Sequence, residues 1–161
     1  MSLPTDLTDA RELHLTALID AGASKNTYLD FKSDLPGRDS RGTQDLASDV
    51  SAFANSSGGD LIYGINEYGQ GRAADIVPQV GNMDEEAKRV QDVLMNGIEP
   101  RVPGLQVVPL LVAGGLASRV PQSLAGPHRV RQNNAFYLRE NGRKRSLDVP
   151  EIRGLFLRSE Q

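Results

Sequence analysis

The sequence predicts a single domain of the α/β class, which combines helices and strands, and two observations lead to that prediction. Between Thr43 and Asn66, an amphipathic helix turns through Gly58-Gly59 into a short apolar strand. The chain of 161 residues is long enough for one hydrophobic core, and no apolar run approaches the roughly 20 residues needed to cross a bilayer. We therefore expect one domain with an aliphatic core, since tryptophan is absent.

Before this central stretch, the sequence predicts one helix and one strand. The helix is expected at about 8–21, where leucines and an isoleucine form an imperfect apolar face and Gly22 follows the last turn. The strand is expected at Tyr28–Lys32, where Leu29 and Phe31 point to one face and the other residues to the opposite face. This alternation indicates a strand with one buried face.

The central helix is expected to begin at Thr43, whose hydroxyl can cap the amides of the first turn. Its apolar face comprises Leu46, Val50 and Phe53. We expect this face to be buried against the apolar run Leu61–Ile65, which has the pattern of a strand covered on both sides. Gly58-Gly59 tolerate positive φ just past the helix end, so they indicate a helix stop. The alternative is a backbone opening that a ligand or phosphate could approach.

The rest of the chain alternates again between strand and helix signals. The elements are expected, in order, as a hairpin turn at 67–71, an extended segment at 73–80, a helix at 84–97, a strand at 105–112, a loop at 114–126, strands at 128–132 and 135–139, and a helix from Pro150. Three acids at 84–86 suit the positive end of the helix dipole. Pro109 marks a bulge or an edge strand, because proline cannot donate a ladder hydrogen bond.

The charge of the chain is unevenly distributed. The net charge is −3, yet residues 1–100 hold eight basic against 17 acidic residues, a net charge of −9. Residues 101–145 hold eight basic residues against Glu140 alone, a net charge of +7. A basic segment in an acidic protein is typical of a polyanion site. The absence of cysteine excludes disulfides and thiolate metal sites.

Three motifs occur in order along the chain: YLDFK at Tyr28–Lys32, AFANSSGGDLIYGINEYGQ at Ala52–Gln70 and AFYLRENGRKRSLDVPEI at Ala135–Ile152. Together they resemble the Schlafen AlbA-type DNA-binding domain family, also called the divergent AAA-associated domain. The resemblance extends over about 13–156. It implies one domain with a mixed sheet flanked by helices, and nucleic-acid binding, commonly as the N-terminal module of a longer transcriptional regulator.

The same resemblance implies an enzymatic alternative. Some members are metal-dependent nucleases acting on RNA, with two acids five residues apart at the first strand and a third near the end of the central strand. At the matching positions this sequence keeps Asp30, but has Lys25 in place of the earlier acid and Asn66, followed by Glu67, at the strand end. A lysine supplies a cation where a cation would bind. We therefore expect no cofactor and no nuclease activity.

The nuclease alternative would require two catalytic acids and one bound metal ion. Asp30 and Glu67 would be the catalytic residues, and together with Asp34 they would hold one Mg²⁺ or Mn²⁺ through carboxylate oxygens. Each of these acids is as readily explained as a surface side chain, which is the reading we favour.

The leading hypothesis is a binding module for DNA or RNA. The expected phosphate contacts are Arg129, Arg131, Arg139, Arg143, Lys144 and Arg145, with polar contacts from Asn55 and Ser56 at the end of the central helix. Such contacts hold a backbone without reading its sequence, so low sequence specificity is expected.

A third hypothesis is an interaction module. The opposite charges of the two chain segments would suit a homo-oligomer, such as a dimer, in which the basic segment of one copy meets the acidic segment of another. The N-terminal residues lack a basic segment followed by an apolar core, so no secretory signal is expected. No membrane association and a cytoplasmic location are the corresponding expectations.

Overall fold

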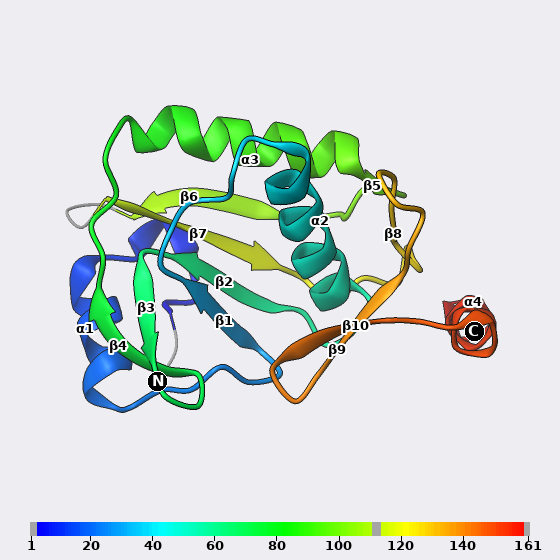
Figure 1. Cartoon of the computed structure of the whole chain (residues 1–161), viewed down its shortest axis with the longest axis horizontal. Coiled ribbons are helices and arrows are strands. Elements are labelled where there is room, and N and C mark those ends of the chain that lie inside the picture. Colours follow the sequence, from blue (N-terminus) through cyan, green and yellow to red (C-terminus); the bar gives the residue numbers. More distant parts are fainter. Residues whose placement is uncertain (1–2, 111–113, 160–161) are drawn as a thin grey trace.

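The computed structural model describes residues 3–110 and 114–159 and has a four-stranded sheet at its centre (Figure 1). Its strands are β1 (Leu29–Lys32), β2 (Gly59–Tyr63), β6 (Gln106–Leu110) and β7 (Gly115–Val120). Their order is β1-β2-β7-β6, with β1 parallel to β2 and the other two pairs antiparallel. The predicted mixed sheet is therefore confirmed, and β2 lies in its interior.

Helices cover both faces of this sheet. The helical elements are the 3-10 helix η1 (Leu7–Asp9), α1 (Glu12–Asp20), α2 (Ser40–Ala54), α3 (Met83–Gly97) and α4 (Val149–Ser159). Leu61 and Tyr63 of β2 pack with α2 and α3 on one face. Ile62, one position between them, packs with η1 and α1 on the other face. This is the alternation expected of a strand buried on both sides.

The predicted core of the central helix is confirmed. Leu46, Val50 and Phe53 are essentially inaccessible to solvent and lie in one cluster with Leu61 and Tyr63 of β2. The helix begins three residues earlier than predicted, because Asp39 is the N-cap and its carboxylate accepts a hydrogen bond from the amide of residue 42 at 2.8 Å. Aspartate is as good a cap as threonine, so the polar loop before the helix held a second equivalent signal.

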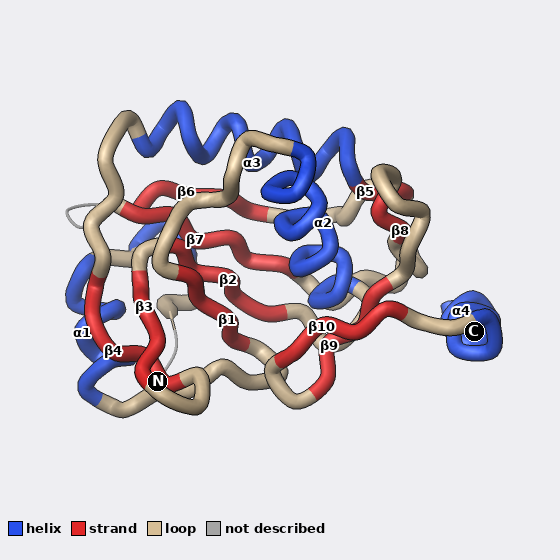
Figure 2. The backbone as a smooth tube through the Cα atoms, viewed as in Figure 1, coloured by secondary structure: helices blue, strands red, loops and turns tan. Residues whose placement is uncertain are grey.

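Three two-stranded ribbons surround the sheet (Figure 2). They pair β3 (Ile65–Tyr68) with β4 (Arg72–Ile76), β5 (Ile98–Glu99) with β8 (Arg129–Val130), and β9 (Tyr137–Glu140) with β10 (Arg143–Ser146). The β3–β4 ribbon is the hairpin predicted around 67–71. The predicted partner strands at 128–132 and 135–139 instead make one isolated bridge and pair mainly with other strands.

The largest error of the sequence prediction is the segment 114–126, which was expected to be a loop. Residues Gly115–Val120 form β7, which lies between β2 and β6. Its first residue is a glycine because a Cβ there would lie 2.4 Å from the carbonyl oxygen of Tyr63. Because three of its six residues are Gly115, Ser118 and Arg119, the strand lacks a regular alternation of apolar and polar residues. The predicted strand at 105–112 is β6, an edge strand as Pro109 indicated, and its residues 111–112 lie outside the described residues.

The last helix, α4, stands apart from the sheet at one end of the molecule (Figure 1). Leu155 is its buried residue, and the ring of Phe156 packs edge-to-face on Phe136 with 6.0 Å between centroids. Arg158 donates a hydrogen bond to the carbonyl oxygen of Asn55 at 3.0 Å. Among the described residues, every helix is too short or too polar to span a bilayer.

Candidate nucleic-acid interface

Ion pairs join the acidic and the basic parts of the chain. They connect Asp60 to Arg119 (2.8 Å), Glu99 to Arg129 (2.7 Å), Asp30 to Arg139 (3.3 Å) and Asp49 to Lys144 (3.0 Å). Much of the uneven charge is thus neutralised within one molecule. The charge split therefore gives no specific support to head-to-tail association of two copies, and the homo-oligomer stays a prediction.

Arg139 is inside the molecule, which corrects its expected place among the phosphate contacts. Only 1% of its side chain is exposed. Its guanidinium lies 4.4 Å from the centroid of the Phe53 ring and 3.3 Å from the Asp30 carboxylate. It also donates to the carbonyl oxygens of Asn26 and Leu29, each at 3.0 Å. These partners satisfy the guanidinium, so Arg139 holds β9 against β1 and α2.

Asn55 and Ser56 have structural roles instead of the expected polar contacts to a ligand. The buried amide of Asn55 donates to the carbonyl oxygens of His128 (2.9 Å) and Tyr137 (3.0 Å), and accepts from the amide of His128 (2.7 Å). The hydroxyl of Ser56 accepts from the amide of Arg139 at 2.9 Å. The end of α2 therefore fixes the positions of β8 and β9.

Lys144 also faces inward. Its ammonium lies 3.0 Å from Asp49 and donates to the hydroxyl of Ser48 at 2.7 Å. Asp49 is 4% exposed and also contacts the ammonium of Lys32 at 3.1 Å. Burial alone would lower the pKa of Lys32, but the Asp49 carboxylate outweighs it and the pKa is raised. Lys144 thus attaches β10 to α2 through a carboxylate shared by two lysines.

The remaining arginines lie on the surface, and most of them face acids. Arg145 contacts Glu140 (3.0 Å) and Glu151 (2.6 Å), and its hydrogen bonds lower the pKa of Glu151 to about 2. Arg129 pairs with Glu99, whose carboxylate is also 3.8 Å from Arg131. These two arginines share one carboxylate, so their side chains lie on the same side of the molecule.

Arg143 differs from the other five candidates. It is exposed at the start of β10, and no acid within the described residues pairs with it. It borders a cavity of about 430 Å³, together with Lys25 and Glu67. The turn before it, Asn141-Gly142, has φ of 51° and 77°, as a tight hairpin turn requires. This turn packs on the chain at residue 25, because a Cβ on Gly142 would lie 3.2 Å from the carbonyl oxygen of Lys25.

Lys25 lies between two of the acids of the enzymatic alternative. Its ammonium is 3.6 Å from Asp30 and 3.4 Å from Glu67, and it also lies 5.3 Å from the centroid of the Phe31 ring. Asp34 borders a different cavity, of about 170 Å³, beside Lys32 and Asp49. Asp30 and Glu67 therefore meet at Lys25, whereas Asp34 lies apart from them. The interpretation of Asp30 as a surface side chain is wrong, because its carboxylate is buried between Lys25 and Arg139.

The residues present do not fit the metal centre that the resemblance implies. Within the described part of the chain, no group of three or more histidine, cysteine or acidic side chains could hold an ion. A metal between Asp30 and Glu67 would also have to displace the Lys25 ammonium, which already balances their charge.

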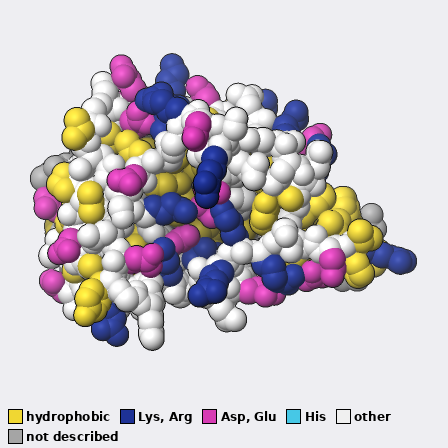
Figure 3. Space-filling model, in the orientation of Figure 1, with side chains coloured by type: hydrophobic (Ala, Val, Ile, Leu, Met, Phe, Trp, Pro, Cys, Tyr) yellow, Lys and Arg dark blue, Asp and Glu magenta, His cyan; other side chains and the backbone are white. Residues whose placement is uncertain are grey.

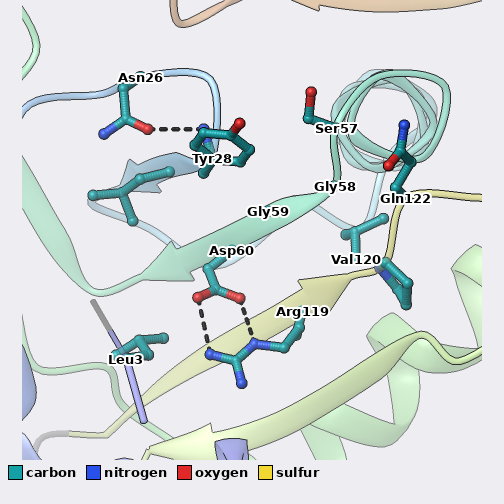
Figure 4. Close-up of a pocket in the computed structure, with 12 residues that line it drawn as sticks. Leu3, Asn26, Tyr28, Ser57, Gly58, Gly59, Asp60, Arg119, Val120 and Gln122 are labelled. Atoms are coloured by element: carbon teal, nitrogen blue, oxygen red, sulfur yellow. Dashed lines mark hydrogen bonds and ion pairs between the residues drawn. The ribbon is translucent and has the colours of Figure 1, made fainter. Parts of the chain in front are cut away.

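A second, larger cavity of about 510 Å³ lies at the Gly58-Gly59 turn (Figure 4). A Cβ on Gly58 would lie 2.6 Å from the backbone of β7, and a Cβ on Gly59 would lie 2.5 Å from the Phe53 ring. The two glycines therefore end α2 and also allow close packing at the start of β2. The predicted helix stop is therefore confirmed, and the approach of a ligand to this turn stays a prediction.

Figure 3 shows lysine and arginine side chains gathered across the middle of the face that carries α2, β1 and the β9–β10 hairpin, with acidic side chains between them. The mixed sheet with helices on both faces defines a small α/β domain. On its hairpin surface, cations that are paired with acids lie beside Arg143, which has no such partner among the described residues. The sequence matches the protein family described as Schlafen, AlbA_2 over residues 25–148, which is most of the chain. The chain belongs to this family.

One solved structure with a TM-score above 0.5 supports the fold. The DIP2311 protein from Corynebacterium diphtheriae aligns with 89% of this chain at 20% identity and a TM-score of 0.53, and this chain spans 28% of that protein's chain. The N-terminal domain of a RecG-related protein from Nitrosomonas europaea aligns with 68% of this chain and 71% of its own at 17% identity and a TM-score of 0.47. Among curated proteins, none matches the sequence.

Sequence reasoning missed two features of this surface. One is the role of Arg119, which bonds Asp60 through two nitrogens and also donates to the carbonyl oxygens of Pro4 and Thr5. The other is the cavity beside Tyr28. The available signal for the cavity was Tyr28 itself, because the strand alternation put this aromatic residue on the polar face.

Proposed function

We propose that this chain binds nucleic acid, and that the backbone phosphates lie along the cavity between the β3–β4 and β9–β10 turns. Arg143 is the principal contact, and Lys25 lies on the same cavity. A guanidinium fork matches two phosphate oxygens, whereas a compact ammonium acts as a point charge. Membership of the Schlafen, AlbA_2 family supports a role with nucleic acid.

The observation that carries this proposal is the unpaired charge of Arg143. Around the cavity, Lys25 pairs with Asp30 and Glu67, whereas Arg143 makes no ion pair among the described residues. Arg139, behind the cavity, pairs with Asp30. Glu140, which lies opposite Arg143 in the hairpin, is engaged by Arg145. One cation is therefore left in excess, and it is the exposed one. An anion bound at Arg143 displaces no existing ion pair, so its binding carries no cost of breaking one.

The test is a binding titration at several salt concentrations with duplex DNA, single-stranded DNA and structured RNA. Two to three phosphate contacts give a log–log slope of about −2 to −3 for a duplex, since each contact contributes roughly −0.9. The Arg143→Ala variant should weaken binding to all sequences alike and make the slope shallower by about one unit.

Arg145→Ala is the matched control, because Arg145 is exposed on the same strand but already engaged by two acids. We expect it to change the slope much less than Arg143→Ala. The proposal fails if the chain binds none of the three nucleic acids, or if Arg143→Ala leaves affinity and slope unchanged.

The geometry supports the alternative functions less well than nucleic-acid binding. A nuclease role would need a reactive centre, and the Lys25 ammonium between Asp30 and Glu67 argues against one. Wild-type protein with Mg²⁺ or Mn²⁺ should therefore leave RNA and DNA uncleaved; cleavage that disappears in Asp30→Ala would contradict this. A function in transcriptional regulation and a cytoplasmic location stay predictions.

A further inference from the structure

The larger cavity, at the Gly58-Gly59 turn, has the walls of a site for a flat, partly polar ring. Leu3, Leu29, Val120 and Pro121 supply apolar surface. In Figure 4 the Tyr28 side chain stands on one side of the glycine turn, and Ser57 and Gln122 stand on the other. The apolar surface favours a ring that leaves water, and the polar rim provides groups that can recognise its edge.

Tyr28 presents its ring to solvent at the rim of this cavity. It lies in the turn just before β1 and is 62% exposed, although aromatic side chains are mostly buried. Its backbone is fixed, since the Tyr28 backbone amide donates to the Asn26 side chain at 2.8 Å and its carbonyl accepts from the Asp60 amide at 2.8 Å. The structure thus places an aromatic side chain at the rim, where a second ring can stack on it.

The polar side chains of the rim are available. Among the described residues, the Ser57 hydroxyl, the Gln122 amide and the Tyr28 hydroxyl have no hydrogen-bond partner. The charged residues on the floor are already paired, because Arg119 bonds both carboxylate oxygens of Asp60. The cavity therefore offers uncharged donors and acceptors, and suits an uncharged ring better than a phosphate.

This cavity and the proposed phosphate site are lined by residues that are neighbours in the sequence. Asn26 and Tyr28 border the larger cavity, whereas Lys25 borders the cavity of Arg143. The Cα atoms of Lys25 and Tyr28 lie no more than about 11 Å apart, because three peptide units join them. A few nucleotides of one strand can cover this separation.

Resting on the proposed function, we infer that the cavity beside Tyr28 binds a nucleobase of single-stranded nucleic acid. The base stacks on the Tyr28 ring, and the Gln122 amide donates to and accepts from the base edge. The phosphates of the same strand lie at Lys25 and Arg143. A base in an intact duplex is stacked and paired, so it cannot enter, and single strands are the preferred ligand.

The experiment compares three fluorescent probes by anisotropy: a 12-nucleotide single strand, an abasic sugar-phosphate strand of the same length, and a duplex. Wild-type protein should bind the base-containing strand roughly 5- to 150-fold more tightly than the abasic strand, since stacking on an aromatic side chain contributes about 1–3 kcal/mol per base. Tyr28→Ala should remove this preference and leave abasic binding unchanged. Arg143→Ala should weaken binding to both strands equally.

Tyr68→Ala is the control for the loss of an exposed tyrosine, because Tyr68 is 71% exposed and does not line this cavity. Competition by free nucleoside monophosphates separates a site for the base alone from one that needs the strand. Displacement only at millimolar concentration supports a nucleic-acid strand as the ligand. Displacement at micromolar concentration overturns the proposal, because the site would then bind a free nucleotide.

The two proposals fail separately. Salt-dependent binding with equal affinity for the base-containing and abasic strands overturns the nucleobase site and leaves the phosphate site intact. Absence of salt-dependent binding to every probe overturns the proposed function, and the nucleobase site with it.

Discussion

The two sides of the β9–β10 hairpin use the same residue type for opposite purposes. On the inner side, Arg139 is buried between Asp30 and the Phe53 ring, and each of its three guanidinium nitrogens donates a hydrogen bond. On the outer side, Arg143 stands four residues further along the chain with no acid to pair with among the described residues. One arginine holds the hairpin in place, and the other is free to bind.

This difference shows that the basic side chains of a segment have to be sorted into those already paired with acids and those without a partner. Only the second group is evidence for a binding site. Arg139 and Lys144 face buried carboxylates, so their charges are needed inside the molecule. Arg145 is exposed but engaged on two sides. The number of cations that remain for a polyanion is much smaller than the net charge of the segment indicates.

The largest effect is expected for Arg139→Ala. It leaves the Asp30 carboxylate with only Lys25 and removes the contact with Phe53, so stability should fall by roughly 3–5 kcal/mol. Urea unfolding measures this change. Arg143→Ala, at an exposed position in the same hairpin, should stay within about 0.5 kcal/mol of wild type. Equal losses in the two variants would contradict the inner and outer roles.

The next effect concerns Lys25, whose ammonium lies between the Asp30 and Glu67 carboxylates. Lys25→Glu places a third carboxylate beside Asp30 and Glu67, which should create a site for Mn²⁺. With a dissociation constant of roughly 0.1 mM, about 10 mM Mn²⁺ should add ~2.7 kcal/mol of stability, or about 5–10 °C in Tm. Differential scanning fluorimetry should show this gain in the variant and little change in wild-type protein. A similar gain in wild type would mean that Lys25 does not block the ion.

A smaller effect is expected for Lys144→Ala. Asp49 would keep Lys32 as its only cation, and the link between β10 and α2 would be lost. Because Lys144 is partly exposed, we expect a loss of about 1–2 kcal/mol. The decisive comparison is the salt slope of nucleic-acid binding, which should match that of wild type. A slope as shallow as that of Arg143→Ala would mean that Lys144, like Arg143, contacts phosphate.

The smallest effect is a pH dependence at Glu151. Arg145 lowers the pKa of this carboxyl from 4.5 to about 2 in the folded protein, so the native state holds fewer protons than the unfolded state between these values. Its contribution to stability is complete above pH 4.5 and is lost as the pH falls toward 2. Glu151→Gln should lower Tm slightly at pH 6 and should match wild type near pH 2. Glu85→Gln, at an exposed acid without an ion pair within the described residues, is the control.

The sequence predicted the centre of the fold well because the signals there are local. Helical periodicity, paired glycines and an apolar run specified α2 and β2, and Pro109 marked the edge strand β6. It failed at β7, where a glycine and a central arginine are required by close packing and by the ion pair with Asp60. Those requirements come from residues distant in the sequence, so no local pattern expresses them.

The candidate site was predicted only in part, for a similar reason. Charge patterning located the basic segment, and the motif comparison located Lys25 opposite the acids. Neither could show that Arg139 is buried beside Asp30, because its burial depends on β1 and α2 packing against β9. The nucleobase cavity needs residues from β1, the Gly58-Gly59 turn and the end of β7, which only the folded chain brings together.

The Asn55 amide has a consequence for the order in which this molecule folds. Its hydrogen bonds reach 73 residues along the chain to His128 and 82 residues to Tyr137, so they form only after a long loop has closed. Because such loops are slow to close, we expect these contacts to form after the transition state. Loss of the amide should therefore accelerate unfolding while leaving the folding rate nearly unchanged, so the lifetime of the folded hairpin depends on a residue at the end of a helix rather than on the hairpin itself.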